Sequence, residues 1–212
     1  MSVIVGRMIS ATPRPRVSSE QRRKQLLRLA SRLFAKQGFA NTTTRQLAQA
    51  AGVKESIVFR FFASKEDLYW QVLEHQIELH GDRSWFQGAL DSEGTDRQIL
   101  MTIAIESLHR DKNLARLLLF TQLDNARFAN KFINLHLDPL HYAMANFVEK
   151  RIRQGRFRNV DPLLATRFFT GGVAHYFQIQ VLLSGKPLDE PQADAVAGTF
   201  VDIWLQGMLR KV

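Results

Sequence analysis

Cysteine is absent from this chain of 212 residues. Its absence excludes disulfide bonds, thiolate catalysis and zinc sites with cysteine ligands, and it agrees best with a reducing compartment. A metal site would therefore need histidine and carboxylate ligands. The six histidines include the pairs His75/His80 and His136/His141, each five positions apart, whereas residues on one face of a helix are three or four apart. We expect no metal and no cofactor; a metal sensor built from His136, Asp138 and His141 is the alternative.

Long apolar runs are missing as well. The uninterrupted apolar runs in helical segments reach only a few residues, as in 117–120, whereas a membrane-spanning helix needs about 18. The chain also lacks the motifs Gly-x-Ser-x-Gly, Gly-x-Gly-x-x-Gly and His-Glu-x-x-His, and it has no phosphate-binding loop. The sequence therefore predicts a protein that neither crosses a membrane nor catalyses a reaction.

Acidic residues are scarce in the first third of the chain. Residues 1–65 contain 13 lysines and arginines but only two acidic residues, Glu20 and Glu55. Residues 66–212 contain 16 lysines and arginines and 18 acidic residues. This asymmetry predicts a polyanionic partner for the first third, either nucleic acid or an anionic membrane surface. We favour nucleic acid, because the first helix lacks the wide, aromatic-rich apolar face that insertion into a membrane surface requires. Residues 1–17 are interpreted as a flexible basic arm; a mitochondrial-type targeting peptide would have a similar composition.

Strand signals are missing too, since no alternating run rich in Val, Ile and Thr ends in an Asn-Gly or Asp-Gly turn. Apolar residues recur every three to four positions, which predicts an all-α fold. Pro139 is expected to kink or end the longest helix. The predicted helices cover residues 18–38, 43–50, 54–61, 64–81, 96–110, 112–123, 126–153, 162–183 and 190–209.

Residues 38–65 have the form of a helix-turn-helix. Thr43 and Gln46 have the spacing of a capping box, Gly52 can take the left-handed conformation that ends the first helix, and helical spacing resumes at Val53. This segment and its flanks contain four motifs: Leu-Phe-Ala-x-x-Gly-Phe, Thr-x-Arg-x-Leu-Ala, Ala-Gly-Val and Phe-x-x-Phe-x-Ser-Lys-Glu-x-Leu. With these motifs the chain resembles the TetR family of bacterial repressors from about Arg23 to Leu73.

The resemblance implies DNA contacts at two helices. The helix at 54–61 would enter the major groove, and the start of the preceding helix would present amides, hydroxyls and a guanidinium to phosphate oxygens. Lys65 matches the lysine with which the family contacts the DNA backbone. The residues expected to contact DNA are Thr43, Thr44, Arg45, Lys54, Glu55, Ser56, Ile57, Phe59, Arg60 and Lys65.

Four positions depart from the family pattern, so the operator sequence cannot be transferred from relatives. Lys54 replaces a capping Ser or Thr, Ser56 a common Gly or Pro, Ile57 a common Thr, and Phe59 a tyrosine whose hydroxyl reaches a phosphate. Phe59 keeps only apolar contact, for example with thymine methyl groups. For Glu55 two roles stay open: it complements the helix dipole or accepts a hydrogen bond from a cytosine amino group.

Aromatic residues are frequent in the remainder of the chain, where they predict a helical core. In the TetR-like arrangement this domain also encloses a small-molecule pocket, and its last two helices pair with a second copy. Candidates for the pocket are Trp85, His109, Phe120, Phe128, His136, Tyr142 and His175. Candidates for the dimer interface are Phe168, Gly172, His175, Ile179, Phe200 and Trp204.

Together these observations predict an N-terminal three-helix DNA-binding domain over 18–64 and a larger helical domain for ligand binding and dimerisation over 65–212. The resemblance implies a homodimeric repressor, cytoplasmic and associated with the bacterial nucleoid, that binds a palindromic double-stranded operator. A small-molecule effector, which the sequence does not identify, would release it; the opposite sign, a corepressor, stays open. A sequence-indifferent, chromatin-like DNA binder without an effector is the alternative.

Overall fold

The computed structural model of this chain describes residues 18–80, 84–124 and 126–210, so the predicted basic arm at 1–17 lies outside the described residues. Regular structure in the described part is helical, apart from one isolated antiparallel bridge between Phe157 and Leu209. This confirms the predicted all-α fold. The helices are α1 (Ser19–Gln37), α2 (Thr44–Ala51), α3 (Glu55–Phe61), α4 (Lys65–His80), α5 (Ser84–Asp91), α6 (Asp96–Leu108), α7 (Lys112–Asp124), α8 (Ala126–Phe132), η1 (Ile133–Leu137), α9 (Asp138–Arg153), α10 (Pro162–Tyr176), η2 (Phe177–Leu183) and α11 (Glu190–Met208).

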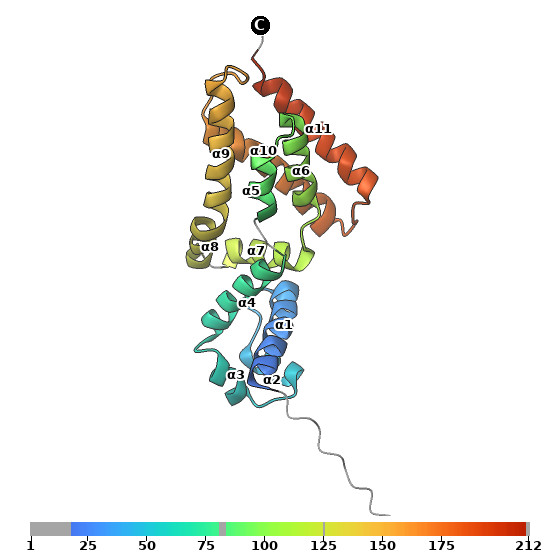
Figure 1. The fold of residues 1–212 in the computed structure, drawn as a ribbon. Coiled ribbons are helices and arrows are strands. Elements are labelled where there is room, and N and C mark those ends of the chain that lie inside the picture. Colours follow the sequence, from blue (N-terminus) through green and yellow to red (C-terminus); the bar gives the residue numbers. More distant parts are fainter. Residues whose placement is uncertain (1–17, 81–83, 125, 211–212) are drawn as a thin grey trace, which may run out of the picture.

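The helices form two lobes stacked end to end (Figure 1). Helices α1 to α4 make the smaller lobe, and α5 to α11 make the larger one. Helix α7 crosses between the lobes and contacts both α1 and α4. Helices α2 and α3 lie at the end of the small lobe that is farthest from the large lobe. The predicted helix-turn-helix is therefore at the outer end of the molecule.

Side-chain caps fix the starts of the N-terminal helices. Ser18 Oγ accepts a hydrogen bond from the Gln21 amide at 3.1 Å, and the Gln21 side chain accepts one from the Ser18 amide at 2.9 Å. Thr43 and Gln46 form the same reciprocal pair. These bonds satisfy first-turn amides that have no partner within the helix. The capping box predicted at Thr43 and Gln46 is confirmed.

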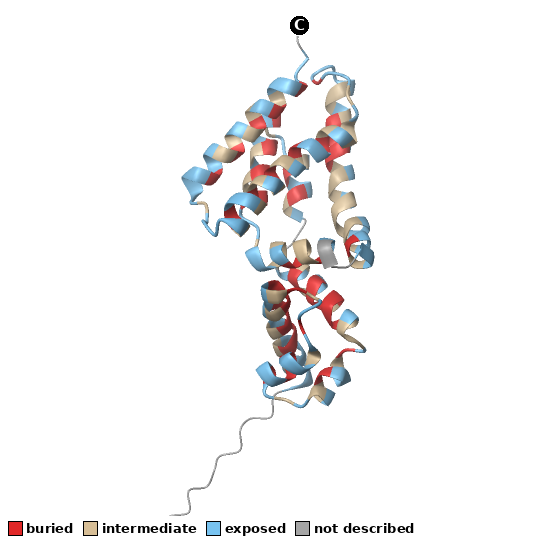
Figure 2. Cartoon of the chain, turned by 180° about the vertical axis from the view of Figure 1, so that it is seen from behind, coloured by how far each residue is buried: buried red, intermediate tan, exposed pale blue. Residues whose placement is uncertain are grey.

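The core of the small lobe explains why α1 to α4 pack together. Figure 2 shows buried residues gathered where these helices meet. Leu26, Ala30 and Phe34 of α1 are buried as predicted, while Leu33 is only half-buried. Leu117 of α7 belongs to the same core and is fully buried there. The large lobe therefore contributes a side chain to the interior of the small one.

The large lobe has its own apolar core, drawn mainly from α6, α9, α10 and α11. Its main buried charge is Asp96, the first residue of α6, which accepts hydrogen bonds from Arg151 at 2.7 Å and pairs with Arg156 at 2.8 Å. A buried carboxylate is tolerated when it is paired in this way. The two ion pairs hold the start of α6 against the end of α9.

Two predicted helices differ from the observed ones, and one helix was not predicted. The helix expected over 126–153 is interrupted by η1, where the Asp138 amide donates to the carbonyl five residues earlier. Pro139 lies in the first turn of α9, where its missing amide costs little. The helix expected over 162–183 ends in a π-helical segment, η2. Helix α5 was missed, because eight residues with a central glycine give little periodic signal.

Candidate nucleic-acid interface

Gly52 forms the turn between α2 and α3. Its φ of 64° and ψ of 35° lie in the left-handed region, and its amide donates a hydrogen bond to the Gln49 carbonyl at 3.1 Å. The Val53 amide then donates to the Ala48 carbonyl at 3.0 Å, so the chain reverses within four residues. A side chain at position 52 would strain this backbone even though the space around it is open. The turn fixes the angle at which α3 leaves α2.

Two pairs of polar side chains hold α2 against its neighbours. Thr44 Oγ1 donates a short hydrogen bond to the Glu55 carboxylate, which joins the first turn of α2 to the first turn of α3. Gln46 Oε1 accepts a bond from Gln37 Nε2 at 3.1 Å, which joins α2 to α1. The sequence reasoning missed the Thr44–Glu55 contact, because the two residues are 11 positions apart. Glu55 thus has an intramolecular role besides the two that the sequence left open.

The start of α2 has the properties of a phosphate-binding terminus. The capping box occupies the amides of Thr43 and Gln46, whereas those of Thr44 and Arg45 have no acceptor among the described residues. Arg45 is exposed, and the Thr43 hydroxyl retains its hydrogen for donation to a further acceptor. Free amides, a hydroxyl and a guanidinium at one helix N-terminus favour an anion such as a DNA phosphate.

Helix α3 is held by its inner face and exposed on its outer face. Val58 is fully buried, which fixes the rotation of the helix. Lys54, Ser56, Phe59 and Arg60 are exposed, and Phe59 keeps 50% of its surface accessible. Ile57 is half-buried. Six of the ten predicted contact residues, namely Thr43, Arg45, Lys54, Ser56, Phe59 and Arg60, are therefore exposed on this one end of the lobe.

Two lysines lie at helix starts, Lys54 before α3 and Lys65 in α4. Lys54 occupies the N-cap position, and its side chain makes no cap hydrogen bond. A cation at that position faces the positive end of the helix dipole, which a phosphate would offset. The Lys65 ammonium lies 4.2 Å from the centroid of the Phe39 ring, so a cation–π contact orients the first residue of α4.

The seven predicted pocket residues differ in how far they are buried. Trp85, Phe120, Phe128 and His136 are half-buried, but His109, Tyr142 and His175 are exposed. Phe128 and His136 lie against Trp70 of α4, each with its ring centroid 6.3 Å from the indole. Of the set, these two are at the junction of the lobes.

The predicted dimer residues divide into an exposed group and an inner group. Phe168, His175 and Ile179 are exposed, and Phe168 keeps 74% of its surface accessible. Gly172 and Phe200 pack against each other within the protomer, since a Cβ at Gly172 would be 3.1 Å from the Phe200 ring. Trp204 is a correction: it is buried in the core of its own protomer, where its indole donates to the Ala165 carbonyl at 3.1 Å.

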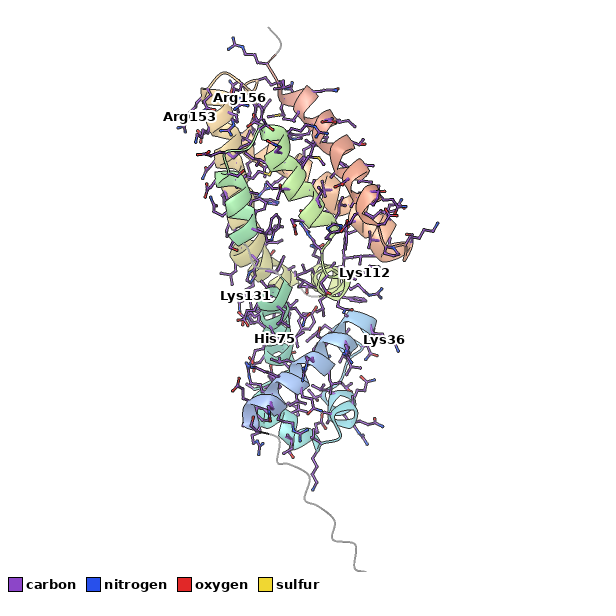
Figure 3. The ribbon with its side chains drawn as sticks, turned by 45° about the vertical axis from the view of Figure 1, so that its right-hand side comes forward. Lys36, His75, Lys112, Lys131, Arg153 and Arg156 are labelled. Carbon is purple, nitrogen blue, oxygen red and sulfur yellow. The ribbon has the colours of Figure 1, made fainter. Side chains whose placement is uncertain are left out.

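Several contacts at the junction between the lobes were not anticipated. Lys131 of α8 places its ammonium 3.5 Å from the centroid of the Trp70 ring, and Figure 3 shows Lys131 and Lys112 at this level of the molecule. The Tyr69 hydroxyl lies 2.8 Å from Thr121 Oγ1 and donates to the Leu117 carbonyl at 3.1 Å. The partners are about 50 to 60 positions apart, so local sequence patterns give no signal for them.

The fold and its exposed outer helices define a helix-turn-helix DNA-binding protein. The family described as bacterial regulatory proteins, tetR family, matches residues 26–72, and the C-terminal domain of AefR-like transcriptional repressors matches residues 106–207. The chain belongs to the TetR family of bacterial transcriptional regulators. This membership confirms the predicted resemblance and the prediction of a regulator rather than an enzyme.

Similar proteins cover nearly the whole chain. The transcriptional repressor KstR2 of Rhodococcus jostii is 28% identical over 194 residues, which are 88% of this chain and 91% of that protein. The nucleoid occlusion factor SlmA of Haemophilus influenzae is 28% identical over 165 residues, 73% of each. The solved structure of the ketosteroid transcriptional regulator KstR2 of Mycobacterium tuberculosis superposes with a TM-score of 0.68 at 22% identity, covering 93% of this chain and all of that one.

The described residues contain neither a membrane-spanning helix nor a metal cluster. No described helix is both long and apolar enough to cross a bilayer. No group of three or more histidine, aspartate or glutamate side chains in the described ranges is arranged to hold a metal ion. His141, a member of the alternative metal set, instead has its Nε2 3.2 Å from Thr170 Oγ1.

Proposed function

We propose that this protein is a dimeric, sequence-specific transcriptional repressor that a small-molecule effector releases from its operator. The observation that carries the proposal is the outer end of the small lobe, where α2 offers free amides and α3 an exposed polar face. A recognition helix placed there fits the major groove without obstruction by the large lobe (Figure 1). The ten predicted contact residues keep their roles in this proposal, with Glu55 acting also as the brace for Thr44.

Dimerisation is supported by an apolar face on α10 and α11. On α10, Leu164, Phe168 and His175 are exposed and share one helix face, and α11 has an exposed large apolar residue of its own, Ile203. Leu164 and Ile203 each keep 63% of their surface accessible. Soluble proteins rarely leave several large apolar side chains exposed together. Two copies paired through α10 and α11 would cover this face and present two α3 helices to half-sites about 34–36 Å apart.

Effector control is supported by the contact of the large lobe with α4. Phe128 and His136 pack on Trp70, so a ligand that moves α8 or η1 also moves α4 and the helices attached to it. Such a ligand shifts the equilibrium between a DNA-binding and a non-binding conformation only if it binds these two conformations with different affinity. Typical couplings of about 1–3 kcal/mol change DNA affinity roughly 5- to 150-fold.

Footprinting tests the DNA-binding part of the proposal. DNA selected from a random pool by the full chain is digested with DNase I in the presence of excess unrelated DNA. A repressor protects a short palindrome under these conditions. Uniform protection, or loss of all protection when competitor is added, would instead identify a sequence-indifferent, chromatin-like binder and contradict the proposal.

A further inference from the structure

Phe39 lies in the turn that follows α1, and its backbone is fixed there. Gly38 ends α1 with a φ of 80°, a left-handed value that favours glycine, and its amide donates to the Phe34 carbonyl at 2.9 Å. The hydroxyl of the buried Thr42 donates to the Gly38 carbonyl at 2.7 Å, and the Thr42 amide donates to the Phe39 carbonyl at 3.3 Å. The turn therefore sets the direction in which the Phe39 ring leaves the backbone.

The ring of Phe39 is half-buried against aromatic side chains of two helices. Its centroid lies 6.2 Å from that of Phe34 on α1 and 5.1 Å from that of Tyr69 on α4, with interplanar angles of 23° and 67°. Phe34 and Tyr69 are both fully buried. The ring therefore rests on the core of the small lobe and has a defined orientation.

The ammonium of Lys65 lies over this ring. Its Nζ is 4.2 Å from the Phe39 centroid, and no carboxylate oxygen of the described residues lies within 4.0 Å of it. Lys65 is the first residue of α4, so its charge is near the positive end of the helix dipole, and the negative face of the ring offsets that cost. An ammonium has three N–H donors. It can therefore keep the ring contact and still donate to a phosphate oxygen.

A residue of the large lobe packs against the same ring. Phe128 belongs to α8, at the end of the large lobe that is nearest the small lobe (Figure 1). Its centroid lies 6.0 Å from that of Phe39 in an edge-to-face geometry, with an interplanar angle of 82°. The Phe39 ring thus contacts both the large lobe and a cation of the proposed DNA interface.

We propose that Phe39 is a positioning residue for DNA binding: its ring holds the Lys65 ammonium where it meets a phosphate, and Phe128 holds the ring. A cation–π contact requires the cation to lie over the face of the ring, so a shift of the ring moves the favoured place of the ammonium. An effector that displaces α8 would therefore weaken one phosphate contact directly, besides any movement of α4. This inference rests on the proposed function, in which Lys65 contacts the DNA backbone.

Phe39→Leu tests the positioning role on the full chain, with a duplex of arbitrary sequence because a phosphate contact does not read the bases. We expect DNA affinity to fall about two- to tenfold. The slope of log affinity against log salt concentration should become shallower by up to about one. Phe39→Tyr keeps the aromatic face and should bind as the wild type does.

Phe132→Leu is the matched control for Phe39→Leu. Phe132 is a half-buried phenylalanine of α8 whose ring centroid lies 5.3 Å from that of His136, and the same substitution there should leave the salt slope unchanged. An unchanged slope in Phe39→Leu, tighter binding by it, or an equal loss in Phe39→Tyr or Phe132→Leu would overturn the proposal.

Lys65→Gln separates positioning from a general effect on packing. In this background the ammonium is absent, so Phe39→Leu should cause no further loss of DNA affinity. Phe128→Leu should weaken DNA binding by less than Phe39→Leu does, and its effect should also disappear in the Lys65→Gln background. Losses that persist in that background would show that Phe39 and Phe128 act through packing alone, which would overturn the proposal.

The Lys65 side chain supplies a readout that needs no DNA. Protons that lie over the face of an aromatic ring resonate at lower frequency in NMR spectra, so the ε-methylene protons of Lys65 should be shifted in the wild type. The shift should persist in Phe39→Tyr and disappear in Phe39→Leu. Ordinary Lys65 resonances in the wild type would show that the contact does not form in solution and would contradict the positioning role.

Footprinting separates this inference from the proposed function. If Phe39→Leu reduces the salt slope but no palindrome is protected by the wild type, the positioning role stands and sequence-specific repression is wrong. If the palindrome is protected and Phe39→Leu keeps the wild-type slope, repression stands and the positioning role is wrong. If the wild type binds no duplex, both are wrong.

Discussion

The ammonium of Lys131 lies 3.5 Å from the ring centroid of Trp70, and the same indole donates its Nε1 hydrogen to the Glu74 carboxylate at 2.6 Å. Trp70 belongs to α4, the helix that follows the helix-turn-helix in the small lobe, and Lys131 belongs to α8 of the large lobe. The two residues therefore form a direct electrostatic contact between the small lobe and the large lobe.

Lys131→Met should lower the free energy of unfolding by about 0.5–2 kcal/mol, because it keeps the aliphatic stem but removes the charge over the indole. Chemical denaturation followed by tryptophan fluorescence measures the change. Lys112→Met is the matched control at the same junction, where the side chain is exposed, and it should change stability by less than about 0.5 kcal/mol. Equal effects of the two substitutions would contradict a specific contact at Trp70.

Arg45→Ala should weaken binding to all DNA sequences, because in the proposed function its guanidinium contacts phosphates rather than bases. The slope of log affinity against log salt concentration should become shallower by about one, because one phosphate contact is lost. Titrations at several salt concentrations measure the slope. Arg153→Ala, at the opposite end of the molecule (Figure 3), should leave the slope unchanged. A loss confined to one operator sequence would argue against phosphate contact.

The Thr44–Glu55 bond predicts that these residues act as a pair. A double-mutant cycle with Thr44→Val and Glu55→Gln should give a coupling free energy of about 0.5–1.5 kcal/mol in thermal or chemical unfolding. Additive effects would show that the contact contributes nothing.

Ile57→Ala should change base preference, because in the proposed function the half-buried Ile57 contacts base edges in the groove. Selection from a random pool measures the preference, and the same loss of affinity on every sequence would contradict base contact by Ile57.

Phe168→Asp should convert the dimer to monomer and reduce operator affinity, because it places a charge on the apolar face of α10. Sedimentation measures the oligomeric state. Leu135→Asp alters another exposed large apolar residue, which keeps 50% of its surface accessible and belongs to η1 rather than to α10 or α11, and it should leave the proposed dimer intact. A monomeric Leu135→Asp, or a dimeric Phe168→Asp, would contradict the proposed interface.

His141 should make the unliganded protein less stable at acidic pH. Burial and the charges of Arg167 and Arg110 lower its folded-state pKa below the ordinary value of 6.5. The folded state thus favours neutral His141, so its contribution is present above pH 6.5 and is lost as the pH falls below that value. Burial also lowers the pKa of His75, so the contribution of His141 must be isolated by subtraction. The measurement is the unfolding free energy of the wild type minus that of His141→Gln, taken between about pH 5 and 8. A difference that does not change with pH would contradict the predicted role of His141.

Local sequence signals predicted the helix starts and the DNA-binding end. The capping boxes at Ser18 and Thr43 and the glycine turn at Gly52 depend on residues three or four positions apart, so the sequence contains the complete interaction. The exposed outer face of α3 follows from the same local pattern once Val58 is assigned to the core.

Contacts between distant residues were not predictable in this way. Trp204 resembles an interface residue in sequence, but Phe157 and Phe169 enclose it from other elements, each with its ring centroid 5.6 Å away. The predicted pocket residues were chosen by type alone, which explains why three of them are on the surface.

Helix α7 has a consequence for the engineering of chimeric regulators. Leu117 fills the interior of the small lobe, the Tyr69 hydroxyl is anchored on the Leu117 carbonyl, and Arg116 Nε donates to the Ala35 carbonyl at 2.9 Å. If the small lobe of a relative were transplanted with the crossover after α4, it would lack its own residue at the position of Leu117. A cavity would then remain in its interior. Crossovers that keep α7 with the transplanted small lobe would preserve that packing and these hydrogen bonds.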